Sequence, residues 1–263
     1  MDRTGKRLWL GVVNLGGFLA TVAVNALAVI LPLNNRSTGE LSDLYPNLFV
    51  PAGHTFSIWS VIYLLLAVFC IYELMPVVRR DADRGAFIDR IGPLFLSSSV
   101  LNMAWIFAWH YEMVELSVGI MLLFLVTLIA IYLRLGIGVS RASGQEKYLV
   151  HMPFSVYLGW ISVATIANIT ALLVSWNWDG FGLDPQLWTF LVMAVAVALA
   201  IIMLVSRRDV YYALVIDWAL LGILLKRLSD DNMADQYVVA AAVVGLVLVS
   251  GFVLFRLFTR KVY

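Results

Sequence analysis

Four side chains with hydrogen-bonding groups interrupt long apolar stretches of this sequence: Asn25, Trp59, Asn102 and Asn168. Polar groups inside apolar segments are energetically expensive, and they are typical of binding sites or of contacts between helices. Each of the four stands about six or seven residues from the predicted outer end of its segment, which at about 1.5 Å per helical residue is a depth of roughly 9–11 Å. The shared depth predicts a partly polar chamber in the outer half of a helix bundle.

Helical spacing places aromatic, small and amide side chains on common faces, because residues three or four apart lie on the same side of a helix. Trp160, Ala164 and Asn168 share one such face, which Tyr157 and Ala171 extend. Faces of this mixed character suit a flat, mostly apolar ligand with a few polar groups. The residues predicted to bind this ligand are Asn25, Phe56, Trp59, Tyr63, Asn102, Trp105, Trp160, Ala164 and Asn168.

The same residue types also have a structural interpretation. Asn side chains hydrogen-bond membrane helices to one another, with a contribution of about 0.6–2 kcal/mol each. This role and a role in ligand contact can coexist. Tryptophan is enriched at membrane interfaces, and we interpret Trp9, Trp176, Trp178 and Trp188 as residues of that interfacial belt.

Asp217 is the only carboxylate near the middle of a predicted membrane segment. Two interpretations stay open: proton-coupled transport of a small amphipathic solute, or a protonated carboxyl group that is hydrogen-bonded to a neighbouring helix. Glu73, at the inner end of its segment, is expected to pair with an arginine. The sequence has no glycine-rich phosphate loop, serine-nucleophile motif or His–Glu zinc motif, so we assign no catalytic residue and no metal ligand. An enzymatic role is left open but is not favoured.

The elements that must position these residues follow from the composition. Hydrophobic residues make up 62% of the 263 residues and charged residues 13%, whereas soluble domains carry about 25% charged residues. With a mean hydropathy of +0.90, the chain is expected to be an all-α, polytopic transmembrane helix bundle. The 18 basic and 17 acidic residues give no electrostatic reason to bind nucleic acid. Eight segments reach the length of about 20 apolar residues that a membrane requires: 9–31, 53–75, 91–109, 114–135, 151–174, 187–206, 210–225 and 237–257.

The basic residues predict the orientation of the bundle, because lysine and arginine favour the cytoplasmic side. Fifteen of the 18 fall on one side of the eight segments, and only Arg36, Lys226 and Arg227 fall on the other. Both termini are therefore expected in the cytoplasm, with the protein in a bacterial inner membrane. The longest loop, 32–52, lies on the opposite side and is rich in apolar residues. We expect it to fold back on the bundle as a lid, the alternative being a plain surface loop.

Three of the predicted helices carry motifs that resemble the TspO/MBR family, which includes the tryptophan-rich sensory proteins and the translocator protein, also called the peripheral benzodiazepine receptor. The second helix has a Pro-containing start followed by aromatics, namely Pro51, Phe56, Trp59 and Tyr63. The third has Asn102, Trp105, Phe107 and Trp109, and the fifth has Trp160, Ala164, Thr165 and Asn168. The resemblance covers about residues 9–175, so we divide the chain into a TspO-like five-helix ligand-binding core, 1–175, and three additional helices, 176–263.

The resemblance implies a membrane receptor or sensor that binds a tetrapyrrole such as porphyrin or haem, or another hydrophobic small molecule, in a pocket of the five-helix core. It implies no required cofactor, a homodimer in the lipid bilayer, and no securely established enzymatic reaction. The basic-aromatic cholesterol consensus of animal members is absent after Asn168, so a cholesterol role is not carried over. The three additional helices have no counterpart in five-helix members, and the ligand can therefore differ.

Overall fold

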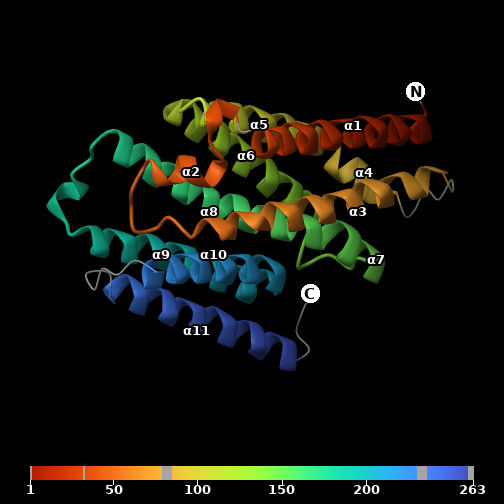
Figure 1. Ribbon diagram of the computed structural model, residues 1–263. Coiled ribbons are helices and arrows are strands. Elements are labelled where there is room, and N and C mark those ends of the chain that lie inside the picture. Colours follow the sequence, from red (N-terminus) through yellow and green to blue (C-terminus); the bar gives the residue numbers. More distant parts are fainter. Residues whose placement is uncertain (1, 32, 79–84, 230–235, 260–263) are drawn as a thin grey trace.

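A computed structural model of the chain describes residues 2–31, 33–78, 85–229 and 236–259, and every regular element in these ranges is helical (Figure 1). Eight long helices form the described bundle: α1 (Arg3–Ile30), α3 (Ile58–Val78), α5 (Leu94–His110), α6 (Val114–Leu135), α8 (Met152–Ser175), α9 (Pro185–Ile202), α10 (Val210–Ser229) and α11 (Gln236–Phe258). These eight helices coincide with the eight predicted segments to within a few residues, apart from the N-terminal end of α1.

Short helical elements connect the long ones. The short α-helices are α2 (Thr38–Asp43), α4 (Ala86–Ile91) and α7 (Gly144–Glu146). The 3-10 turns are η1 (Leu33–Asn35), η2 (Gly53–Ser57) and η4 (Gly180–Gly182), and the π turns are η3 (Lys147–His151) and η5 (Met203–Arg207).

Six helical stretches within the described residues are long and apolar enough to cross a membrane. The two long helices outside that set are α5, which has 17 residues, and α10, which carries Asp217, Lys226 and Arg227. An all-helical, multi-pass membrane protein is therefore confirmed, and membrane crossing by α5 and α10 stays a prediction. Figure 1 shows that α1 begins and α11 ends toward the same end of the bundle.

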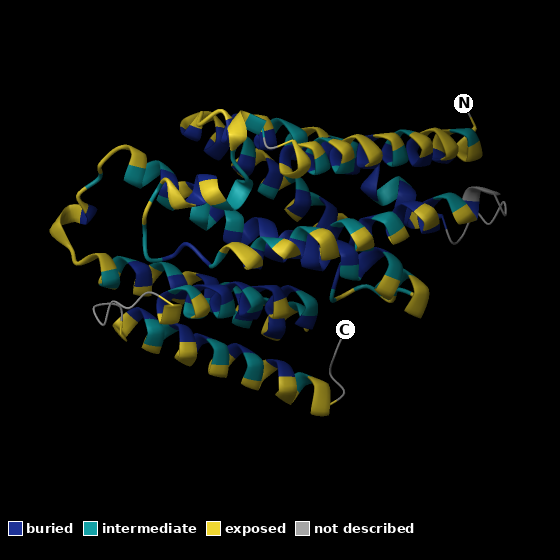
Figure 2. Ribbon diagram, in the orientation of Figure 1, coloured by how far each residue is buried: buried dark blue, intermediate teal, exposed yellow. Residues whose placement is uncertain are grey.

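Apolar side chains also cover the outside of the bundle. Leu64, Val126 and Val247 are exposed by 67%, 62% and 66%, and Figure 2 shows such exposed positions alternating with buried ones along the outer helices. An apolar outer surface would be unfavourable in water but is suited to lipid, so the exposed faces agree with a membrane location.

The C-terminal helices are packed against the rest of the bundle mainly through α10, which contacts both α8 and α11. Close contact depends on Gly222, because a Cβ atom there would lie 2.1 Å from Thr55 Oγ1. Two hydrogen bonds cross the same contact: the Ala52 amide donates to the Gly222 carbonyl at 3.0 Å, and Trp218 Nε1 donates to the Thr55 carbonyl at 2.9 Å. Helix α10 therefore holds the segment that precedes α3.

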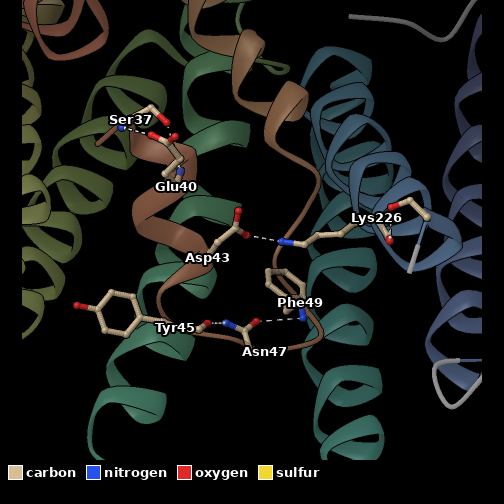
Figure 3. Close-up of polar contacts among 8 residues, drawn as sticks. Ser37, Glu40, Asp43, Tyr45, Asn47, Phe49 and Lys226 are labelled. Carbon is tan, nitrogen blue, oxygen red and sulfur yellow. Dashed lines mark hydrogen bonds and ion pairs between the residues drawn. The ribbon is translucent and has the colours of Figure 1, made fainter. Parts of the chain in front are cut away.

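The long loop between α1 and α3 folds back on the bundle, as its apolar composition predicts. Leu41, Phe49 and Val50 are at most 4% exposed. The Tyr45 ring lies 5.8 Å from the Trp109 ring, and Asn47 closes a turn by donating to the Tyr45 carbonyl and accepting from the Phe49 amide (Figure 3). Whether this loop acts as a lid stays a prediction.

Candidate ligand-binding site

An aromatic group forms around Trp59 near the start of α3. Its indole stacks on Tyr63 at 5.6 Å between ring centroids and lies 6.4 Å from Trp105 of α5. Tyr157 and Trp160 of α8 meet the same indole edge-on, at 6.2 and 6.3 Å. Helices α3, α5 and α8 therefore meet at one set of rings, and Phe56 extends it by an edge contact of 5.9 Å with Trp160.

A series of side-chain hydrogen bonds runs beside these rings and joins three helices. Asn25 Nδ2 of α1 donates to Asn102 Oδ1 of α5 at 2.8 Å, and Asn102 Nδ2 donates to the Tyr157 hydroxyl of α8 at 3.0 Å. All three side chains are nearly or fully buried, Asn25 by the smallest margin at 9% exposed. These buried amides have no water to bond to, so they need each other as partners. The hydrogen bonds therefore fix how α1, α5 and α8 pack.

A second polar group is centred on Asn168 of α8. Trp105 Nε1 donates to Asn168 Oδ1 at 3.0 Å, and Asn168 Nδ2 donates to Ser117 Oγ of α6 at 2.9 Å. Trp105 belongs both to this polar group and to the aromatic group around Trp59. We call the combined set the aromatic–amide cluster; it consists of Asn25, Phe56, Trp59, Tyr63, Asn102, Trp105, Tyr157, Trp160 and Asn168.

Eight of the nine residues predicted to bind ligand are members of this cluster. The ninth, Ala164, is partly buried one turn after Trp160 on α8. Tyr157 was placed on the same helix face but was not among the nine, although it links the rings to the amides. The cluster is filled by its own side chains, and none of the nine residues lines the cavity described next.

That cavity lies beside the cluster and has a volume of about 880 Å³. It is lined by the loop 42–50, the C-terminal half of α8, the connection to α9 and the start of α9, and Lys226 and Arg227 at the end of α10. Trp178 and Trp188, interpreted from the sequence as interfacial residues, are among its walls. No periodic pattern in the sequence signals this cavity, because its walls come from segments far apart in the chain.

The two buried carboxylates of the long helices differ from each other. Asp217 Oδ2 accepts a hydrogen bond from Ser250 Oγ of α11 at 2.8 Å, and its Oδ1 has no partner among the described residues. Glu73 Oε1 accepts from Asn14 Nδ2 of α1 at 2.8 Å and forms no ion pair within the described part of the chain. The expected pairing of Glu73 with an arginine is not seen in the described residues, where α1 presents an amide instead; the nearby Arg79, Arg80 and Arg84 lie outside the described residues.

Sequence reasoning missed Asp209, which is fully buried between η5 and α10. Its Oδ2 accepts from Ser155 Oγ at 2.6 Å and from the Tyr132 hydroxyl at 2.8 Å, and its Oδ1 accepts from the backbone amides of Tyr211 and Tyr212, both at 3.1 Å. An aspartate directly before an apolar helix is a signal for an N-cap. The sequence gives no sign that this cap also joins α6 and α8.

Comparison with known proteins agrees with the family motifs. A family model described as TSPO-like protein matches residues 11–255. No curated protein and no solved structure matches the chain. The motifs themselves lie within the first 175 residues, whereas the family model also includes α9, α10 and nearly all of α11. The chain therefore belongs to the TSPO-like family of membrane proteins.

Proposed function

We propose that this protein is a membrane receptor or sensor that binds a flat, largely apolar ligand of the tetrapyrrole class, such as porphyrin or haem, at the aromatic–amide cluster. Family membership supports a membrane sensor or binding protein in general terms. The cluster supports the narrower ligand class, because it offers several indole and phenol ring faces together with amide groups in an apolar setting.

One observation carries this proposal. The Trp160 side chain is 3% exposed, and its Nε1–H has no hydrogen-bond partner in the described residues. A buried donor without a partner costs about 1–3 kcal/mol, so such groups are rare unless a ligand or water satisfies them. Trp59, which lies against Trp160, is only partly buried. Rotation of Trp59 would open a path to the Trp160 donor, where a polar group on the rim of a flat ligand can accept.

Titration of the detergent-solubilised protein with protoporphyrin IX, followed by quenching of tryptophan fluorescence, tests the proposal. Trp59→Ala and Asn168→Ala are each expected to weaken binding at least about tenfold, or roughly 1.4 kcal/mol. Trp160→Phe retains an aromatic ring but removes the donor, and it is expected to weaken binding several-fold. Trp9→Phe is the matched control, because Trp9 is 54% exposed at the other end of α1. Equal affinities in all four variants and the wild type would show that the cluster is structural only.

A second candidate function rests on Asp217. This residue is 9% exposed, and its carboxyl group accepts one hydrogen bond and has one oxygen without a partner in the described residues. A group of this kind can take up and release a proton, as a proton-coupled transporter of a small amphipathic solute requires. Proton-driven flux into vesicles that disappears in Asp217→Asn, while porphyrin binding persists, would favour the transporter. The family resemblance further supports a homodimer, which size-exclusion chromatography with light scattering would test.

A further inference from the structure

The cavity of about 880 Å³ is separate from the aromatic–amide cluster and shares no residue with it. Its volume is within the range of about 300–1,000 Å³ that is typical of sites for drug-sized molecules. It exists only because α9 and α10 pack beside the five-helix core, so it is a feature of the whole bundle rather than of the core alone.

Most of the cavity wall is apolar. Phe49 and Leu48 contribute from the loop, Ile166 and Leu173 from α8, and Val192 from α9. Trp178 and Trp188 also line it, with their rings 4.9 Å apart. An apolar body of a ligand, either an alkyl chain or a ring system, would therefore be removed from water and stabilised by these walls.

The polar groups of the wall are mostly engaged with their own backbone. The Thr170 and Thr189 hydroxyls donate to carbonyls one turn earlier in their helices, and Asp179 accepts from the Phe181 amide. Lys226 is different, because its ammonium group pairs with Asp43 from the end of α2 (Figure 3). The Asp43 side chain is 60% exposed and the Lys226 side chain 23%.

An ion pair of this exposure contributes only about 0–1 kcal/mol, and an ammonium group has three N–H donors. An acidic group on a ligand can therefore replace Asp43 or join it. Arg227, which also lines the cavity, adds a second positive charge next in sequence. Two carboxylates, Asp43 and Asp179, line the same cavity and balance these charges. Asp179 already accepts a hydrogen bond from the Phe181 amide, so the exposed Lys226–Asp43 pair is the place where an anion can reach a positive charge.

We infer that this cavity is a second binding site, which takes an amphipathic molecule whose anionic head group binds Lys226 and whose apolar part lies against Phe49, Leu173 and Trp188. The head group is a carboxylate or a phosphate. A free long-chain acid and an anionic phospholipid are the two sources of this chemistry. The inference does not depend on porphyrin binding at the cluster.

Brominated stearic acid is a suitable probe, because bromine quenches tryptophan fluorescence at contact and Trp188 lines the cavity. Brominated stearyl alcohol is the neutral control with the same chain. Both are titrated into the full-length protein in detergent. The wild type is expected to bind the acid more tightly than the alcohol, and Trp188→Phe is expected to remove much of the quenching.

If Lys226 receives the anion, variants of the two members of the ion pair should affect the affinity for the acid differently. Lys226→Gln is expected to weaken binding of the acid about fivefold or more, or roughly 1 kcal/mol, without affecting the alcohol. Asp43→Asn removes the competing carboxylate and is expected to leave binding of the acid unchanged or tighter. Lys6→Gln, an exposed lysine near the N-terminus, is the matched control. Equal weakening in Lys226→Gln and Asp43→Asn would show that the ion pair only holds the loop, and would overturn the inference, as would equal binding of acid and alcohol.

Native mass spectrometry of protein purified from membranes distinguishes the two sources. A bound anionic phospholipid that is lost in Lys226→Gln identifies the lipid head group, and binding of the brominated acid without such a lipid identifies a free acid. If neither binds in a way that depends on Lys226, the inference is wrong. Trp59→Ala separates it from the proposed function, because this variant should lose porphyrin binding and retain binding of the acid.

Discussion

Asn25 of α1 and Asn102 of α5 form a side-chain hydrogen bond of 2.8 Å in the interior of the bundle, although 77 positions separate them in the chain. Asn102 is fully buried, and it also donates to Tyr157. One amide therefore joins α1, α5 and α8 through both of its polar atoms. The aromatic rings of the candidate site are packed directly beside this junction.

Replacing Asn102 with Leu should destabilise the protein by about 1–3 kcal/mol, because Asn25 and Tyr157 would keep buried polar groups without their partner. Thermal unfolding in detergent would measure the loss. Replacing Asn25 with Leu as well should recover part of the stability, since removal of both partners leaves fewer unsatisfied groups. If the double variant is less stable than either single one, the hydrogen bond is not the main contribution of these residues.

Gly222→Ala should destabilise the packing of α10 against η2 by about 1–3 kcal/mol, as is typical of overpacking. The added Cβ would lie 2.1 Å from Thr55 Oγ1, so one of the two segments must shift. Gly251→Ala on α11 is the control, because a Cβ there meets nothing within 4 Å. The unfolding temperature of Gly222→Ala should fall and that of Gly251→Ala should not. If the double variant Thr55→Ala/Gly222→Ala recovers part of the lost unfolding temperature, the contact with Thr55 is the cause. Equal unfolding temperatures in the two glycine variants would contradict the prediction.

Asp209→Asn should lower the free energy of unfolding by about 2–3 kcal/mol, because the carboxylate accepts from two hydroxyls and two backbone amides in a fully buried position. An asparagine amide keeps only one acceptor oxygen. Asp184→Asn is the matched change, since Asp184 caps α9 at an exposed site where asparagine serves about equally well. Unfolding curves of the two variants should differ clearly; matching curves would show that Asp209 acts only as a cap.

The link between Arg7 and Asp89 should make stability depend on acid pH. Arg7 donates to Asp89 Oδ2 from Nε at 3.1 Å and from a terminal nitrogen at 2.7 Å. These hydrogen bonds, together with the positive charges of Arg7, Arg3 and Lys6, hold the pKa of Asp89 below its ordinary value of 3.8. A carboxyl group with a lowered pKa in the folded state stabilises the fold above its unfolded pKa, and the stabilisation is lost as pH falls through the folded pKa.

Asp89→Asn should therefore be less stable than the wild type at pH 7, and the difference should narrow as the pH falls below the ordinary aspartate value. Unfolding temperatures measured across this acid range would test the prediction. Asp184→Asn is a control, because Asp184 caps α9 at an exposed site where asparagine serves about equally well. A constant difference between Asp89→Asn and the wild type at every pH would show that charge on Asp89 is unimportant.

Both ends of the chain should be labelled only from the cytoplasmic side. Cys70 is fully buried, so introduced cysteines would dominate the labelling. Asp2→Cys and Thr259→Cys are expected to stay unlabelled in intact cells treated with an impermeant maleimide, whereas Phe181→Cys, exposed by 78% at the opposite end, should react. The reverse labelling pattern would show that the bundle has the opposite orientation in the membrane. Labelling at only one terminus would show that the number of spans is odd.

Much of the helical framework could be predicted because a bilayer restricts the possible structures. A spanning helix needs about 20 apolar residues, and irregular backbone is excluded from lipid, so apolar length alone determines where helices lie. The segment 114–135 has the same bounds in the sequence prediction and in α6. Depth and helical face likewise predicted that Asn25, Asn102 and Trp59 lie close together, since both quantities are properties of a single helix that can be counted along the chain.

Tertiary structure alone decided the cavity and the ion pair between Lys226 and Asp43. The sequence showed a lysine at the end of a helix, and its partner Asp43 is 183 positions away. Their contact depends on how closely α10 approaches η2, which Gly222 and Thr55 set by shape rather than by any repeating pattern. The same holds for Asp209, whose four donors come from three helices. Local periodicity determines which face of a helix is polar, whereas the space left between helices depends on how all their side chains pack together.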